Sequence, residues 1–154
     1  MKKVIITLTA IVLILSLAAC GSKNVEMDIA AVSKEISGAS LFLDADLQSV
    51  KAENITGQTG IDTSACASAE YHNGAAATGE EWGLFECNSA KDAEAMVTQL
   101  EAHRDSLMTT YKDYAPDAVP RIENAVIMSK GQYVVFITAE KYAEAQKIAD
   151  KYFA

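Results

Sequence analysis

Cysteine, histidine, proline and tryptophan are scarce in this chain, and several familiar kinds of active site are missing with them. The 154 residues include three cysteines, two histidines, two prolines and one tryptophan. No Cys-x-x-Cys pair occurs, so the motif of a thioredoxin-type redox site is absent. A glycine-rich phosphate loop, a Gly-x-Ser-x-Gly elbow and a His-Glu-x-x-His zinc motif are absent too. The sequence therefore gives no motif for an enzyme, and it predicts neither a metal site nor another cofactor.

Positive charge is also in short supply. Thirteen Lys and Arg residues stand against 21 Asp and Glu residues, for a formal net charge of −8. An acidic surface repels nucleic acids and anionic lipid headgroups, so neither is expected as a partner. Solubility beside an anionic membrane and wall explains this charge, and binding of cations or basic ligands is the alternative.

Only one long hydrophobic run is present. It covers residues 4–19, directly after Lys2 and Lys3. A run of about 16 residues is short for a permanent span, because a bilayer core needs about 20. A basic start, an apolar stretch and small residues at its end are the layout of an export signal, which we assign to residues 1–19.

The end of this run resembles the bacterial lipobox, a Leu followed by two small residues and a Cys. The match is Leu17-Ala18-Ala19-Cys20. It implies cleavage between Ala19 and Cys20, diacylglycerol on the Cys20 sulfur and an N-acyl chain such as palmitate on the new terminus. Two or three fatty chains anchor a protein durably, which predicts a place on the outer face of the cell membrane. The alternatives are an ordinary signal peptide that holds a cysteine, and an uncleaved membrane helix.

The rest of the chain reads as a tether, residues 20–26, and a single α+β domain, residues 27–154. Helical spacing of apolar residues predicts a helix over 27–37, with Asp28 as its cap and Gly38 as its stop. The patch formed by residues 41–43 is expected to dock on the core. A second short helix is expected next, capped by Asp44 or Asp46 and carrying the apolar residues Leu47, Val50 and Ile55.

Two hairpins, each followed by a helix, make up the remainder. Residues 64–73 and 81–87 form the first hairpin, and a long helix runs from its cap Ser89 to Pro116. Residues 122–128 and 132–138 form the second hairpin around Gly131, and residues 139–153 form the last helix. This order predicts a four-stranded antiparallel sheet, with helices covering one face and two short helices in front.

The first hairpin brings chemistry-bearing residues together. If its turn centres near residues 76–77, Tyr71 faces Trp82 and Cys66 faces Cys87. Opposed positions are close enough for a Cys66–Cys87 disulfide after a small adjustment, and two free thiols are the alternative. Strand parity also places His72 on the face of Cys66, so His72 and the two cysteines could act as metal ligands or as a Cys–His nucleophilic pair.

Other polar and aromatic residues favour structural interpretations. We expect His103 on a solvated or boundary face of the long helix. The acidic pairs Glu80–Glu81 and Asp44–Asp46 are expected to be solvated. Five tyrosines have helical or strand spacing typical of core packing, with an aromatic binding surface as the alternative: Tyr111, Tyr114, Tyr133, Tyr142 and Tyr152.

Several segments carry a family resemblance: Gly60-Ile61-Asp62, Glu80-Glu81-Trp82-Gly83-Leu84-Phe85, Tyr114-Ala115-Pro116-Asp117, Pro120, Ile122-Glu123-Asn124-Ala125-Val126 and Gly131-Gln132-Tyr133-Val134. Together they resemble the DUF4358-type family of small lipoproteins of unknown function from clostridia-like Gram-positive bacteria. The resemblance covers residues 60–154 closely and 27–59 loosely. It implies an exported, lipid-anchored α+β domain, and it implies no reaction.

The leading hypothesis is therefore a non-catalytic envelope protein, anchored by lipid, that contacts a protein or wall component through the open face of its sheet. The rival is a small envelope hydrolase or metal-binding protein that uses His72 with Cys66 and Cys87.

Overall fold

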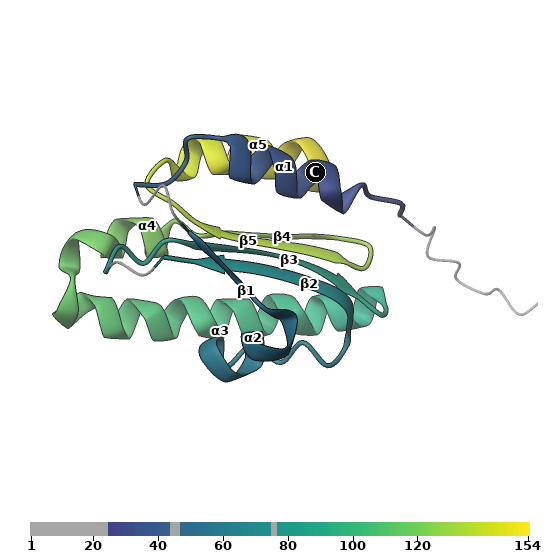
Figure 1. Ribbon diagram of the computed structural model, residues 1–154, viewed down its shortest axis with the longest axis horizontal. Helices are drawn as coiled ribbons and strands as arrows, with labels where there is room; N and C mark the ends of the chain where they lie inside the picture. Colours follow the sequence, from purple (N-terminus) through teal and green to yellow (C-terminus); the bar gives the residue numbers. More distant parts are fainter. Residues whose placement is uncertain (1–24, 44–46, 75–76) are drawn as a thin grey trace, which may run out of the picture.

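The computed structural model describes residues 25–43, 47–74 and 77–154, which form a twisted antiparallel sheet between two layers of helices (Figure 1). The described part has five strands in the order β1-β2-β3-β5-β4. In chain order the elements are α1 (Ile29–Gly38), β1 (Gln48–Val50), α2 (Ala52–Thr59), β2 (Cys66–Asn73), β3 (Glu81–Cys87), α3 (Ala90–Tyr114), the 3₁₀ helix η1 (Pro116–Ala118), α4 (Val119–Glu123), β4 (Val126–Lys130), β5 (Tyr133–Thr138) and α5 (Tyr142–Phe153).

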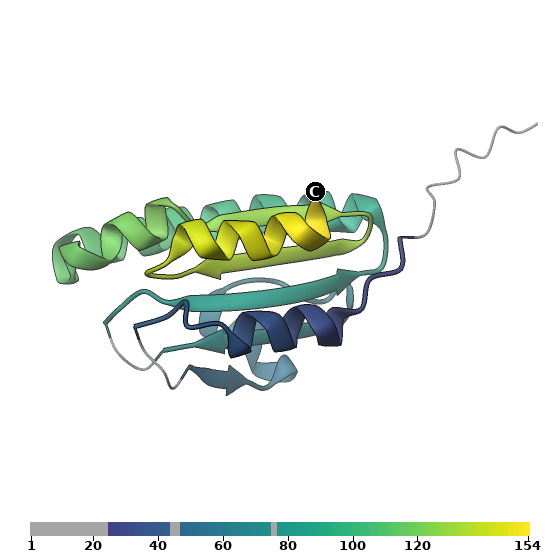
Figure 2. The same ribbon diagram turned by 90° about the horizontal axis from the view of Figure 1, so that it is seen from above.

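Both faces of the sheet are covered, so the prediction of helices on one face is wrong. Helices α1 and α5 lie side by side over one face, and α2 and α3 lie against the other (Figures 1 and 2). Strand β5 explains this, because all six of its residues are buried. Alternate residues of a strand point to opposite faces. Val135 and Ile137 therefore pack beneath α1 and α5, whereas Val134 and Phe136 pack against α3.

The fifth strand is a second departure from the prediction. Residues Gln48–Val50 form an edge strand, β1, that pairs with β2, and the helix α2 begins only at Ala52. The spacing of Leu47 and Val50 fits a helix as well as a short strand. The segment becomes a strand because the edge of β2 offers it backbone hydrogen bonds. The predicted caps Asp44 and Asp46 lie outside the described residues.

The first hairpin has the predicted pairing at only one of the two expected positions. Cys66 lies opposite Cys87, as expected, but Tyr71 lies opposite Gly83 and His72 opposite Trp82. A bulge between Cys66 and Ser68 shifts the register by one residue. Such an insertion reverses which face every later side chain of the strand points to.

The helices that the sequence marked most clearly are present. Asp28 caps α1, with its carboxylate accepting from the amide of Ala31 at 3.0 Å. Ser89 caps α3, and its hydroxyl accepts from the amide of Asp92 at 3.2 Å. The second hairpin turns at Gly131, whose φ of 58° suits glycine. Its first strand starts later than predicted, at Val126, because the preceding residues form α4.

The two ends of the domain differ in what they present, and we call them proximal and distal. The proximal end holds the turn between β4 and β5 and the start of the described chain, where Val25 lies against Gly131 (Figure 2). Helix α1 runs from there to the distal end, where α3 ends and α5 begins (Figure 1). Among the described residues, no helix combines the length and apolar character that membrane crossing requires.

Candidate functional site

A groove of about 310 Å³ opens at the distal end, beside the last turn of α1. Three aromatic or imidazole rings and several small residues line it, namely Ser37, Gly38, Ala39, Ser40, Phe42, Leu47, His72 and Trp82. The groove brings together α1, the loop that follows it and the hairpin of β2 and β3. This placement makes it the best candidate for a binding site in the described part of the chain.

His72 forms one wall of this groove and is held in a fixed orientation. Its ring stacks on Trp82 with centroids 4.2 Å apart and planes 8° from parallel. Its Nε2 lies 2.9 Å from Oε1 of Glu70, and the same oxygen accepts a hydrogen bond from the Ser33 hydroxyl at 2.9 Å. Glu70 and Ser33 were not among the predicted site residues. Glu70 lies two residues from His72 on the same strand face, which is the signal that could have identified it.

The two cysteines lie on the other face of the sheet. The sulfur atoms of Cys66 and Cys87 are 3.6 Å apart, and both thiols are free. Cys87 is buried in the core beneath α3, and Cys66 packs against the same core. Formation of a disulfide between them stays a prediction.

The expected shared face of His72 and Cys66 is wrong, because the bulge in β2 lies between them. His72 stacks on Trp82, which belongs to the core beneath α1 and α5, whereas both cysteines belong to the core beneath α3. The sheet therefore separates the imidazole from both sulfurs. In residues 25–43, 47–74 and 77–154 no group of three or more His, Cys, Asp and Glu side chains could hold a metal ion.

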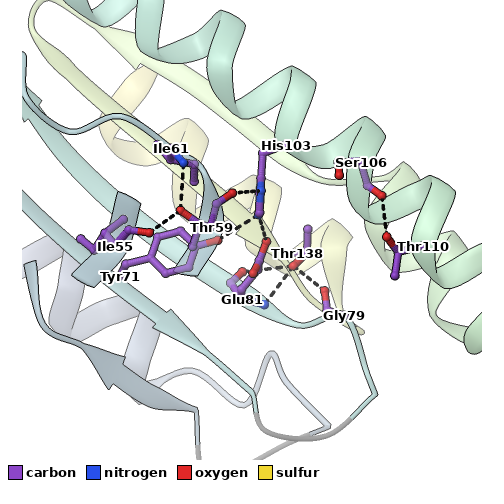
Figure 3. Close-up of polar contacts among 10 residues, drawn as sticks. All are labelled: Ile55, Thr59, Ile61, Tyr71, Gly79, Glu81, His103, Ser106, Thr110 and Thr138. Atoms are coloured by element: carbon purple, nitrogen blue, oxygen red, sulfur yellow. Dashed lines mark hydrogen bonds and ion pairs between the residues drawn. The ribbon is translucent and has the colours of Figure 1, made fainter. Parts of the chain in front are cut away.

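His103 lies at a boundary position of α3, within the expectation, but its imidazole is directed toward the core. Its side chain is only 9% exposed, and its Nε2 lies 2.6 Å from Oε1 of Glu81, which is equally buried (Figure 3). The Tyr71 hydroxyl lies 3.2 Å from the same nitrogen. The spacing of Met96, Leu100 and His103 repeats along one helix face, so it could have indicated that His103 faces the core.

The hydrogen bonds of His103 engage both nitrogens of its ring. Its Nδ1 lies 3.1 Å from the carbonyl oxygen of Thr59, which can only accept, so Nδ1 carries a proton. With Nε2 directed at Glu81, both ring nitrogens have partners inside the fold. Burial raises the pKa of Tyr71 well above its usual value, and the Glu81 carboxylate raises it further. The Tyr71 hydroxyl therefore stays protonated as a donor.

The acidic pair Glu80–Glu81 is buried, not solvated as predicted. Glu80 is 2% exposed and Glu81 is 7% exposed. The Glu80 carboxylate accepts hydrogen bonds from the amide of Leu43 at 2.9 and 3.0 Å and from the amide of Glu140 at 3.0 Å. Glu80 thus joins the loop after α1 to the loop before α5, which fixes one side of the distal end.

Two of the five tyrosines are exposed, which departs from the expected core packing. Tyr114 is 72% exposed and Tyr142 is 40% exposed, whereas Tyr133 is buried. Leu43 is 57% exposed, although Leu41 in the same patch docks on the core as expected. Leu43, Tyr114 and Tyr142 all belong to the distal end, because they lie in the loop after α1, at the end of α3 and at the start of α5.

The predicted export signal, the cleavage site between Ala19 and Cys20, and the lipidated Cys20 lie outside the described residues. Val25 is the last residue but one of the predicted tether, and it packs against the core beneath α1 and α5.

A comparison with protein-family models places the chain in a family. The model of the domain of unknown function DUF4358 matches residues 40–139, about two thirds of the chain, so the chain belongs to that family. The matched segment begins after α1 and ends before α5. Neither the curated proteins nor the solved structures include a match.

Proposed function

We propose that this protein is an exported, lipid-anchored, non-catalytic binding module, and that its distal groove holds an amine-bearing component of the cell wall. One observation carries the proposal: the groove around His72 lies at the end of the domain opposite to the start of the described chain. A tether that leaves from the proximal end would hold the groove away from the membrane. The proposed location is the outer face of the cell membrane.

The anchor rests on the sequence. Leu17-Ala18-Ala19-Cys20 resembles a complete lipobox, and only four residues separate Cys20 from Val25, the first described residue. The lipid would therefore lie close to the turn between β4 and β5. Family membership agrees with an unknown biochemical role and supplies no reaction.

The absence of catalysis is proposed from how the reactive side chains are held. Both ring nitrogens of His103 have partners within the fold. His72 is separated from Cys66 and Cys87 by the sheet, so a thiol nucleophile has no imidazole base beside it. The rival hypothesis of a hydrolase or metal-binding protein that combines these three residues has lost its geometric basis.

The charge of the groove favours a ligand that donates hydrogen bonds and carries positive charge. Its lining includes the last turn of α1, and a helix C-terminus carries about half a negative unit charge. No Lys or Arg is among the described residues that line it, and the Glu70 carboxylate contacts Nε2 of His72. The net charge of −8 acts in the same direction. A free amino group of a wall peptide or amino sugar fits this chemistry.

The exposed apolar residues at the distal end add a second support. Leu43, Tyr114 and Tyr142 are the exposed large apolar side chains of the described residues, and they share the end that holds the groove. Exposed apolar residues that gather in one patch mark sites of contact with other molecules. They could extend the contact with the wall beyond the groove.

The test is cosedimentation of the detergent-solubilised full chain with isolated cell wall. We expect binding to untreated wall and at least about a tenfold weaker affinity after the wall amines are acetylated, since loss of a charged hydrogen bond costs about 1.5–3 kcal/mol. Trp82 is the only tryptophan and lies beneath His72, so its fluorescence should change when soluble wall fragments bind.

The variant His72→Phe keeps a ring on Trp82 but removes the imidazole, and it should bind wall more weakly. Ser68→Ala is the matched control, because Ser68 lies on the same face of β2 outside the groove. Equal binding by both variants would exclude the groove. Equal binding to acetylated and untreated wall would exclude an amine as the ligand.

A further inference from the structure

We propose that Cys66 and Cys87 form a redox-active dithiol that exchanges with external disulfides at the proximal end of the domain. This inference is independent of the groove and of the wall ligand. The two residues are directly opposed across β2 and β3, and their sulfurs lie 3.6 Å apart. A disulfide needs sulfurs about 2.05 Å apart, so side-chain movement of about 1.5 Å closes the bond.

The backbone around the pair is held in place on both sides. The amide of Asn88 donates to the carbonyl of Ala65 at 2.8 Å, and the amide of Cys87 donates to the carbonyl of Gln132 at 2.8 Å. The bulge after Cys66 lies outside the regular ladder. Rotation of the Cys66 side chain, with a small movement at the bulge, can therefore bring the sulfurs together without opening the sheet.

The two thiols differ in solvent exposure, and this difference indicates which one reacts first. Cys87 is 2% exposed, whereas Cys66 is only half-buried. The hydrogen bond with Cys87 lowers the pKa of the Cys66 thiol, and the same bond together with burial raises the pKa of Cys87. Cys66 is therefore the thiol that an external disulfide meets, and it is the one that forms a thiolate more readily.

The exchange then proceeds in two balanced steps. The Cys66 thiolate attacks one sulfur of an external disulfide, forms a mixed disulfide and releases one thiolate. The thiolate released in the first step takes the proton of Cys87, and Cys87 attacks the Cys66 sulfur, which forms the Cys66–Cys87 disulfide and releases the second thiolate. Two thiols of the protein are oxidised and one disulfide is reduced to two thiols, so the oxidant is the disulfide itself. The reverse reaction uses two external thiols, which reduce the Cys66–Cys87 disulfide.

The position of the dithiol says where the exchange takes place. Gln132 accepts from the amide of Cys87 and directly follows Gly131, against which Val25 packs. The pair is therefore close to where the chain enters the domain. A bond there would tie the start of β2 to the end of β3 beneath the first turn of α3.

The experiment follows thiol oxidation in the full chain with Cys20→Ser, so that only Cys66 and Cys87 carry thiols. The folded protein in detergent is treated with oxidised glutathione, and alkylation with intact-mass measurement counts the remaining thiols. We expect both thiols to be lost together, with recovery in reduced glutathione. In Cys87→Ser we expect a stable glutathione adduct on Cys66, because the resolving thiol is gone.

In Cys66→Ser we expect Cys87 to react at least about tenfold more slowly, because that thiol is buried and its pKa is raised. Thermal unfolding of each variant confirms that it is folded, and Cys87→Ala replaces Cys87→Ser if the latter is not. The proposal is overturned if both thiols of the folded protein stay unreactive. It is also overturned if Cys87 reacts first or if the Cys87 variants accumulate no adduct.

Discussion

The two faces of the sheet are held together by different kinds of contact. Against α3, the apolar core surrounds a buried polar network in which Glu81 contacts His103 at 2.6 Å and Tyr71 lies beside them (Figure 3). Beneath α1 and α5, the core is apolar, the buried Glu80 accepts from backbone amides at its distal end, and Lys151 and Tyr152 contact Glu35 at its rim. Buried hydrogen bonds are directional, so they allow fewer alternative side-chain arrangements than apolar contacts do.

The family match follows the same division. All buried residues of the core against α3 lie within residues 40–139, whereas α1 and α5 lie outside that range. The face that carries the polar network is thus the face that the family model describes in full. The face of α1 and α5 carries the groove, so the buried polar network and the candidate binding surface lie on opposite faces of the sheet.

The largest expected effect comes from breaking the buried pair. Replacement Glu81→Ala leaves the buried Nε2 of His103 without its carboxylate partner, and we expect a loss of about 3 kcal/mol in the free energy of unfolding. Urea denaturation followed by circular dichroism measures it. The matched variant on the other face is Glu35→Ala, which removes a contact at the rim and should lower the free energy of unfolding much less, because solvent screens that pair. Equal losses would contradict the contrast between the faces.

A glycine beneath α3 gives the next effect. A Cβ atom at Gly83 would lie 2.7 Å from the ring of Tyr71 and 2.9 Å from the ring of Phe85. We expect Gly83→Ala to lower the free energy of unfolding by about 1–3 kcal/mol through overpacking. The control is Gly57→Ala in α2, where nothing lies within 4 Å and alanine should stabilise the helix by about 0.5–1 kcal/mol. The same denaturation assay compares both, and a neutral Gly83→Ala would show that this core adapts.

The smallest effect is a pH dependence at the rim of the other face. Hydrogen bonds from Lys151, and then from Tyr152, lower the pKa of Glu35 below its ordinary value of 4.5. A carboxyl group with a lowered pKa in the folded state stabilises above its unfolded pKa, and this stabilisation disappears as pH falls through the folded value. The stability difference between wild type and Glu35→Gln should therefore be largest near neutral pH and shrink below pH 4.5. A difference that stays constant from pH 7 to pH 3 would exclude this contact as its source.

Much of the fold could be predicted because its signals are local. Asp28 and Ser89 mark helix starts through capping, and the β-branched run of β5 marks a central strand. Apart from Thr138, the residues of β5 are all hydrophobic, so both sides of the strand had to be buried. The sequence thus indicated helices on both faces of the sheet, yet the prediction placed them on only one. Strand β1 could not be predicted from three residues, because its pairing depends on the edge that β2 offers.

The candidate sites were predictable only in part, and the bulge explains why. Opposition of Cys66 and Cys87 followed from a regular hairpin, but one extra residue in β2 moved His72 to the other face and away from them. Ala67, the residue between Cys66 and Ser68, gives no sequence signal for a bulge. The network of Glu81 and His103 joins residues 22 positions apart on different elements, so only the folded structure reveals it.

The central claim is that a lipid on Cys20 holds this domain at the membrane from its proximal end, with the groove facing outward. The most direct measurement is the intact mass of the protein purified from the membranes of a bacterial expression host, compared with Cys20→Ser. The account predicts loss of residues 1–19, a diacylglycerol and acyl mass on Cys20, and release of the Cys20→Ser protein from its lipid. A chain that keeps its first 19 residues, or a Cys20→Ser variant of unchanged modification and equal membrane attachment, would contradict it.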